Sequence, residues 1–158
     1  MRRAYLLLAL FSAGPAAAGS LIGAEVPPYP DGFSSSMGAC IPDGRDICGY
    51  SIGTLENAEG DVIAIIAEQK TRMADRQPLL RVLDMIDTPA LTDRQAWAIG
   101  ECEIDGRLEP TVAGIVNVKD TGGWIEAADT IWAVRFDPAV GKLRAIDTAR
   151  VTCAIPGS

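Results

Sequence analysis

Hydrophobic and polar residues alternate along several short stretches of this chain, and a period of two is typical of β-strands. The clearest alternation covers residues 95–104, where every second residue from Trp97 to Glu103 falls on one face of the predicted strand. Asp105 and Gly106 follow directly, and this dipeptide favours a tight hairpin turn. We therefore predict that residues 111–119 return as the partner strand.

Residues 61–71 contain a dense run of β-branched side chains, which favours a strand buried on both faces. A helix is the alternative, because residues 68–72 are mostly good helix formers. Further strands are expected at residues 79–87, 130–136, 142–147 and 150–154, with a connection at residues 73–78 and one helical turn at residues 124–129.

These stretches amount to six or seven short strands with turn residues between them, and none has a sustained helical period. The pattern predicts a mostly β fold with little helix. We expect an antiparallel sheet arranged as a sandwich or a half-barrel, stapled by disulfides. Residues 40–158 should form this β-rich unit as a single domain, because a chain of this length is a usual domain size.

The first 18 residues have the pattern of a cleaved secretory signal. Arg2 and Arg3 supply the positive segment, residues 4–13 supply the apolar segment, and the alanines at 16–18 fit the cleavage site. No cysteine follows directly, so we expect no lipid anchor, and no later stretch has the roughly 18 apolar residues of a membrane span. We predict a protein exported to the periplasm or the extracellular medium.

Residues 19–39 are expected to be irregular. Pro27, Pro28 and Pro30 disfavour both a helix and a central strand. Three consecutive serines at 34–36 continue the loop character. The segment either drapes over the domain or is mobile.

The chain is acidic and contains no histidine. Loss of Arg2 and Arg3 with the signal would change the formal net charge from −7 to −9. A negative surface repels phosphate backbones and attracts basic proteins, so we expect a basic protein partner and no nucleic acid. The missing histidine excludes Ser-His-Asp and Cys-His catalysis and removes the commonest metal ligand. We expect neither a cofactor nor a metal, and we favour a protein that is not an enzyme.

The four cysteines form an even set, which in an exported protein predicts a disulfide framework. Three pairings are open. We favour Cys40–Cys48, because the intervening segment is rich in turn residues, together with Cys102–Cys153, which would tie a central strand to the C-terminal strand. The spacings differ from the Cys-x-x-Cys pattern of redox-active dithiols and of zinc sites.

Two short motifs suggest chemistry but lack its other requirements. Residues 49–53 match G-x-S-x-G, yet the nucleophile elbow also needs a histidine base and a large α/β sheet. Asp43 and Asp46 stand in a turn that resembles part of a calcium loop, without the EF-hand spacing or its closing glutamate. We interpret the first as a loop shaped by glycines and the second as a turn inside the disulfide loop.

The candidate binding face combines an aromatic ring with carboxylates and consists of Trp97, Glu101, Glu103 and Asp105. An apolar ring beside negative charges suits a basic or amphipathic partner. Our hypothesis is a soluble exported binding or inhibitor-type module, without catalysis, that binds a basic exported protein on this face, with the Cys40–Cys48 loop as the alternative surface. The alternatives are a small hydrolase that uses these carboxylates and a structural component of the cell envelope.

Overall fold

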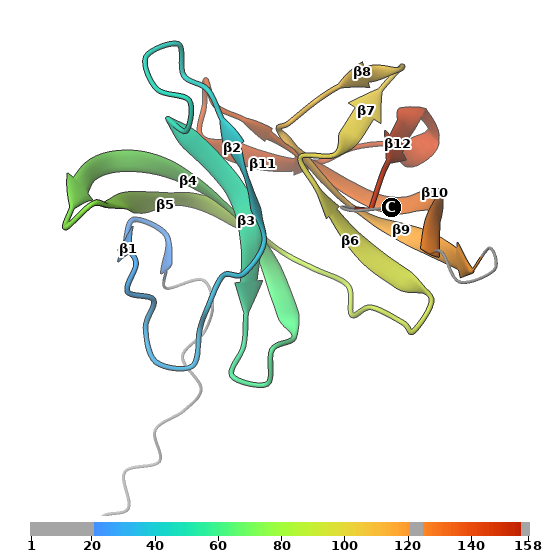
Figure 1. The fold of residues 1–158 in the computed structure, drawn as a ribbon, viewed down its shortest axis with the longest axis horizontal. Helices are drawn as coiled ribbons and strands as arrows, with labels where there is room; N and C mark the ends of the chain where they lie inside the picture. Colours follow the sequence, from blue (N-terminus) through green and yellow to red (C-terminus); the bar gives the residue numbers. More distant parts are fainter. Residues whose placement is uncertain (1–20, 121–124, 156–158) are drawn as a thin grey trace, which may run out of the picture.

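Antiparallel β-sheets make up most of the molecule (Figure 1). The computed structural model describes residues 21–120 and 125–155, and within these ranges there are twelve strands, more than the six or seven expected. Strands account for 58% of the described residues and helices for 3%, which confirms the mostly β, antiparallel fold. The predicted signal at residues 1–18 and Trp124 lie outside the described residues. No helix in the described part is long and apolar enough to cross a membrane.

The first sheet has five strands in the order β1-β5-β4-β3-β2. Its members are β1 (Glu25–Val26), β2 (Gly38–Ile41), β3 (Tyr50–Glu56), β4 (Val62–Ala74) and β5 (Gln77–Asp87). β4 confirms the strand predicted at residues 61–71, and the helical alternative is wrong. All neighbouring strands of this sheet are antiparallel. Residues 21–37, which we call the N-terminal strap, pair with the sheet through β1 and through a bridge between Ser34 and Glu56.

The predicted connection at residues 73–78 is a tight hairpin instead. Asp75 and Arg76 both adopt a positive φ, of 49° and 68°. Two successive residues in this left-handed region are what a two-residue type I′ turn requires. The turn lets Ala74 pair with Gln77, so that β4 and β5 extend to the hairpin end.

The second sheet has four strands in the order β11-β10-β9-β6, and the third has three in the order β12-β7-β8. The second contains β6 (Gln95–Ile99), β9 (Val112–Asp120), β10 (Ile125–Asp137) and β11 (Lys142–Ala145). The third contains β7 (Cys102–Ile104), β8 (Arg107–Leu108) and β12 (Val151–Cys153), the last preceded by a short helix, η2 (Thr148–Arg150).

Two sequence predictions about these sheets are wrong. The segment expected to form a helical turn at 124–129 is strand from Ile125 onward, because it pairs with β9 and accommodates two bulges between Ala127 and Trp132. The single strand expected at residues 95–104 is broken at Gly100, whose φ is 73°. β6 therefore pairs with β9, whereas β7 turns away into the third sheet.

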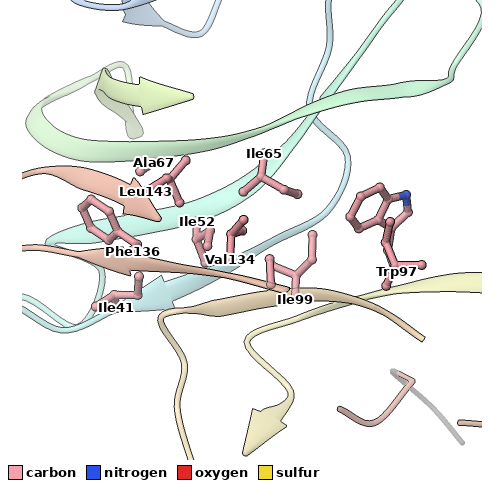
Figure 2. Close-up of a cluster of buried hydrophobic side chains, with 11 residues drawn as sticks. Ile41, Ile52, Ile65, Ala67, Trp97, Ile99, Val134, Phe136 and Leu143 are labelled. Carbon is pink, nitrogen blue, oxygen red and sulfur yellow. The ribbon is translucent and has the colours of Figure 1, made fainter. Parts of the chain in front are cut away.

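The sheets stack in layers, and each interface is a separate hydrophobic cluster. Figure 2 shows the main cluster, in which Ile52 and Ile65 of the first sheet meet Ile99, Val134 and Phe136 of the second. The opposite face of the second sheet packs against the third sheet around the buried disulfide half-cystines. The opposite face of the first sheet is covered by strap residues, Leu21, Tyr29 and Phe33 among them. The strap thus drapes over the sheet.

Both favoured disulfides are present. Cys40–Cys48 closes the loop between β2 and β3, and Cys102–Cys153 joins directly opposite residues of β7 and β12. None of the four cysteines is free. The predicted pairing is therefore confirmed.

Candidate functional site

The predicted face of Trp97, Glu101, Glu103 and Asp105 does not exist as one exposed surface. Trp97 is only 7% exposed, and its ring packs edge-on against Trp132 with a centroid separation of 5.8 Å. The physical reason is the break at Gly100, which sends the chain from the second sheet to the third between Trp97 and the acidic residues. The aromatic member of the face is a core residue.

Glu101 and Glu103 remain exposed on the third sheet. Glu103 lies within β7 and Glu101 directly precedes it, so the two acids stand on either side of the buried Cys102 in the sequence. Leu108 of β8 pairs with Glu103 and is 62% exposed. We call Glu101, Glu103 and Leu108 the acidic edge.

Asp105 has a separate role, because it forms an ion pair with Arg150. The Arg150 Nε donates to Asp105 Oδ1 at 2.7 Å, and the Nη2 of the same guanidinium contacts Oδ2. This hydrogen bonding lowers the pKa of the Asp105 carboxyl. Arg150 therefore compensates the charge of Asp105, and the negative charge of the acidic edge comes from its two glutamates.

Backbone hydrogen bonds and a disulfide fix the strand that carries the acidic edge. Ala154 N donates to Glu101 O at 2.9 Å, and Glu109 N donates to Cys102 O at 2.8 Å. The Cys102–Cys153 bond joins the same strand to β12 covalently. The β7–β8 hairpin of the third sheet extends away from the other strands (Figure 1), and Glu103 and Leu108 are exposed on it.

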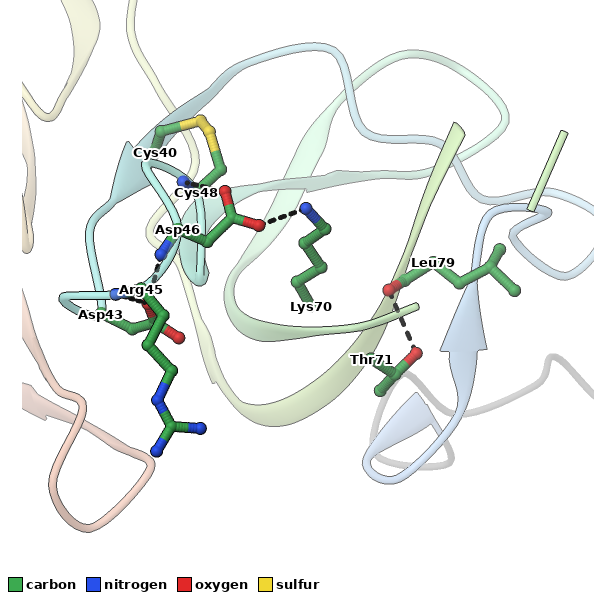
Figure 3. Close-up of polar contacts among 8 residues, drawn as sticks. All are labelled: Cys40, Asp43, Arg45, Asp46, Cys48, Lys70, Thr71 and Leu79. Atoms are coloured by element: carbon green, nitrogen blue, oxygen red, sulfur yellow. Dashed lines mark hydrogen bonds and ion pairs between the residues drawn. A yellow bond between two sulfur atoms is a disulfide. The ribbon is translucent and has the colours of Figure 1, made fainter. Parts of the chain in front are cut away.

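The Cys40–Cys48 loop uses its acidic groups to hold its own shape (Figure 3). Asp43 Oδ1 accepts hydrogen bonds from the backbone amides of Arg45 and Asp46 at 2.8 and 2.7 Å. Asp46 is paired with Lys70 of β4, and that hydrogen bond lowers the pKa of the Asp46 carboxyl. The turn that resembled part of a calcium loop is thus an internally bonded turn attached to the sheet.

Two buried carboxylates form polar sites that the sequence analysis missed. Glu68 of β4 is 4% exposed and accepts from Tyr29 OH and Ser51 Oγ, both at 2.9 Å. Burial raises the pKa of Glu68 in spite of these two hydrogen bonds. Burial also raises the pKa of Tyr29, and the Glu68 charge adds to that effect. Ser51, the serine of the G-x-S-x-G match, lies within strand β3 and not at a strand–helix elbow. The loop expected at residues 49–53 is therefore wrong, because residues from Tyr50 onward pair with both β2 and β4.

Glu56, at the end of β3, is 5% exposed and has the opposite pKa shift. Burial alone would raise its pKa, but hydrogen bonds from Ser36, Thr54 and Ser34 outweigh burial and lower it. The donor distances are 2.7 Å for both the Ser36 and Thr54 hydroxyls and 3.1 Å for Ser34. Glu56 and Glu68 together bind the N-terminal strap to the first sheet.

Two cavities border these elements. One, of about 520 Å³, lies beneath the strap and is lined by Tyr29, Ser51 and Glu68 among others. Its polar groups are already bonded to one another, which makes it a strap attachment rather than an open reaction centre. The other, of about 590 Å³, borders Trp97 and the hairpin turn between β3 and β4. Neither cavity is lined by Glu101 or Glu103.

A scan of protein-family models and searches of curated proteins and of solved structures found no match to this chain. No activity of a relative can therefore be transferred to it.

Proposed function

We propose that the protein is an exported binding or inhibitor-type module that performs no catalysis and binds a basic protein on its acidic edge. The observation that carries the proposal is the pair Glu101 and Glu103, exposed beside Leu108 where the disulfide-braced β7–β8 hairpin extends away from the other strands. The two disulfides and the signal-like pattern at residues 1–18 support export to an oxidising compartment, the periplasm or the medium.

The chemistry of the edge supports a protein partner. The net charge of −7 attracts a basic protein over a distance, and exposed carboxylates at an interface rim raise its association rate. Leu108 supplies apolar surface that a partner can bury, worth about 25 cal/mol for each Å² removed from water. Protein interfaces usually combine an apolar centre with a polar rim.

The position of the two glutamates favours binding over hydrolysis. A carboxylate that acts as a general acid is held in a cleft, where burial raises its pKa. Glu101 and Glu103 are exposed and line neither cavity described above. The small carboxylate hydrolase therefore has no supporting observation at this site.

Affinity capture tests the proposal. The oxidised protein is immobilised and exposed at low salt to exported proteins from the same cells, and bound proteins are eluted with a salt gradient. The variant E101K/E103K reverses the edge charges, and D31K/D93K makes the same change in net charge at two other exposed acids. We expect one basic protein to bind the wild type and D31K/D93K and to be lost with E101K/E103K.

Two results would contradict the proposal. Equal capture by E101K/E103K and the wild type would remove the acidic edge as the binding surface. Retention of the protein itself in the cell-wall fraction, with no soluble partner, would favour the structural envelope component.

A further inference from the structure

One end of the main sandwich core opens into the cavity bordered by Trp97, away from the acidic edge. Its volume of about 590 Å³ falls within the range of small-molecule sites. Apolar side chains from several elements line it, including Met37, Val62, Ile63 and Leu91. The side chains of Met37 and Leu91 are 37% and 38% exposed, so apolar surface at the cavity is accessible from solvent.

Trp97, one of the residues that line this cavity, carries a buried hydrogen-bond donor without a partner in the described residues. The residue is more than nine-tenths buried, and its Nε1 has no acceptor among the residues that the structure describes. Figure 2 shows Trp97 at the end of the core cluster, with the ring nitrogen on the side facing away from Ile65 and Ile99. Buried donors are nearly always paired in folded proteins, so this N–H is suited to a ligand oxygen.

The walls of the cavity are held in place before any ligand enters. Asn57 Oδ1 accepts from the amides of Asp61 and Glu59 at 2.8 and 3.1 Å, which fixes the turn between β3 and β4. Thr88 bonds to β4 through both its amide and its hydroxyl, at 3.1 Å to Ile63 O and 3.0 Å to Val62 O. A preformed cavity loses little conformational freedom when it binds.

The charge at the cavity selects against anions. Asp61 lines the cavity and is exposed, and its carboxylate contacts the Asn57 amide at 3.4 Å. A ligand carboxylate or phosphate would be repelled by this group and by the net negative charge of the protein. An uncharged oxygen can still accept from the indole N–H.

We propose that this cavity binds an uncharged small molecule with an apolar body and one carbonyl or hydroxyl oxygen, which accepts a hydrogen bond from Trp97 Nε1. The site is independent of the acidic edge and goes beyond the function proposed above. The apolar body would occupy the space among Met37, Val62, Ile63 and Leu91.

Octanamide and octanoate are matched probes for this site, because they share a chain length and differ in charge. The oxidised, ¹⁵N-labelled protein is titrated with each, and the indole N–H resonance of Trp97 is followed after assignment with W97F. We expect octanamide to shift this resonance saturably and octanoate to bind at least tenfold more weakly.

Variants separate the donor from the volume of the cavity. W97F keeps an aromatic ring without the N–H and should bind octanamide about fivefold more weakly, the usual size of one lost hydrogen bond. L91W fills the cavity from its exposed side and should abolish binding, whereas V140W adds the same ring at an exposed turn elsewhere and should have no effect.

The proposal is overturned if octanamide leaves the Trp97 resonance unmoved, or if L91W binds octanamide as tightly as the wild type. Equal affinity for octanoate and octanamide would likewise contradict it, since the Asp61 charge would then have no influence on selection. Because Leu91 is partly exposed, the L91W result is informative even if W97F is poorly folded.

Discussion

Glu56 and Glu68 are both buried carboxyls in contact with the N-terminal strap, yet their pKa values shift in opposite directions. Four hydrogen bonds to Glu56 oxygens, three from hydroxyls and one from the Ser36 amide, favour its charged form. Two donors to Glu68 do not offset its loss of hydration. The pKa of each carboxyl reflects the balance between its burial, which raises the pKa, and its hydrogen bonds, which stabilise the ionised state.

The pH dependence of unfolding should separate these two residues. The folded pKa of Glu68 lies above its ordinary value of 4.5, so its contribution to stability is full below that pH and is lost as the pH rises through the folded pKa. E68Q cannot ionise and avoids this loss. In urea unfolding between pH 4 and pH 7, the stability of E68Q relative to the wild type should therefore increase with pH.

E56Q is the matched comparison, with the opposite sign. The folded pKa of Glu56 lies below 4.5, so its contribution is present above that pH and is lost as the pH falls through the folded pKa. We expect E56Q to be less stable than the wild type by about 1–3 kcal/mol at pH 7, with a smaller difference in acid. Parallel pH profiles for the wild type and both variants would contradict the assigned shifts.

These two sites show what local sequence patterns cannot predict at the residue scale. Glu68 counted in favour of the helical alternative, since glutamate is a good helix former. Its partners Tyr29 and Ser51 are 39 and 17 residues away, and only the strap and the β3–β4 pairing bring them together. Alternation within one strand carries no information about such distant donors.

At the scale of elements, Gly100 decides where the second sheet ends and the third begins. Its φ of 73° is in the left-handed region, and a Cβ built there would lie 2.4 Å from the Ala39 Cβ. Because hydrophobic and polar residues alternate both before and after Gly100, the sequence pattern of residues 95–104 matches that of a single strand. The signal that could have revealed the break was the glycine itself, because an isolated glycine in a strand pattern often marks a bend or a close approach.

A pair of alanine substitutions tests this role of Gly100. Gly106 has nearly the same φ, 74°, with no atom within 4 Å of a built Cβ. G106A should therefore destabilise the fold only through backbone strain, by about 1–2 kcal/mol. G100A should cost about 1–3 kcal/mol more, because it adds a steric overlap. Equal losses in the free energy of unfolding for G100A and G106A, measured by chemical denaturation, would show that an overlap with Ala39 does not destabilise the fold.

Other elements were predictable because their signals are local. β-branched residues identified β4, and a partial alternation identified β5. The turn at Asp75 and Arg76 was missed because neither residue is glycine or asparagine, the usual residues of type I′ turns. The start of β10 was missed because its bulges interrupt the period of two.

At the scale of the whole molecule, the third sheet packs on the second through one hydrophobic cluster, and one disulfide cross-links its own strands β7 and β12. Cys102–Cys153 closes a loop with a sequence separation of 51, whereas Cys40–Cys48 closes one of 8. The loss of chain entropy in the unfolded state grows with loop length. The long-range bond is therefore expected to contribute more to stability.

Paired substitutions measure this difference. C102A/C153A should lower the free energy of unfolding by about 4 kcal/mol, and C40A/C48A by about 2.6 kcal/mol. Chemical denaturation of both variants under non-reducing conditions provides the comparison. A larger loss for C40A/C48A would mean that the loop beside Lys70, rather than the third sheet, depends most on its disulfide.

The acidic edge is the feature on which the proposed function depends, and the sequence predicted it in part. Glu101 and Glu103 are exposed as the alternation required, while Trp97 is buried and Asp105 is paired with Arg150. Leu108 could not be anticipated, since only the pairing of β7 with β8 places it opposite Glu103. The remaining surface is smaller than expected and carries two negative charges beside one apolar side chain.

The most direct test is the dissociation constant of the captured basic partner, measured by titration calorimetry at low and at high salt. E101K/E103K should raise it at least tenfold at low salt, and D31K/D93K should change it far less, although the two variants have the same net charge. The difference in dissociation constant between the two variants should shrink at high salt, because exposed charges are screened there. The thermal unfolding midpoints of the two variants should match. If E101K/E103K binds the partner as tightly as the wild type at low salt, the acidic edge is not the binding surface.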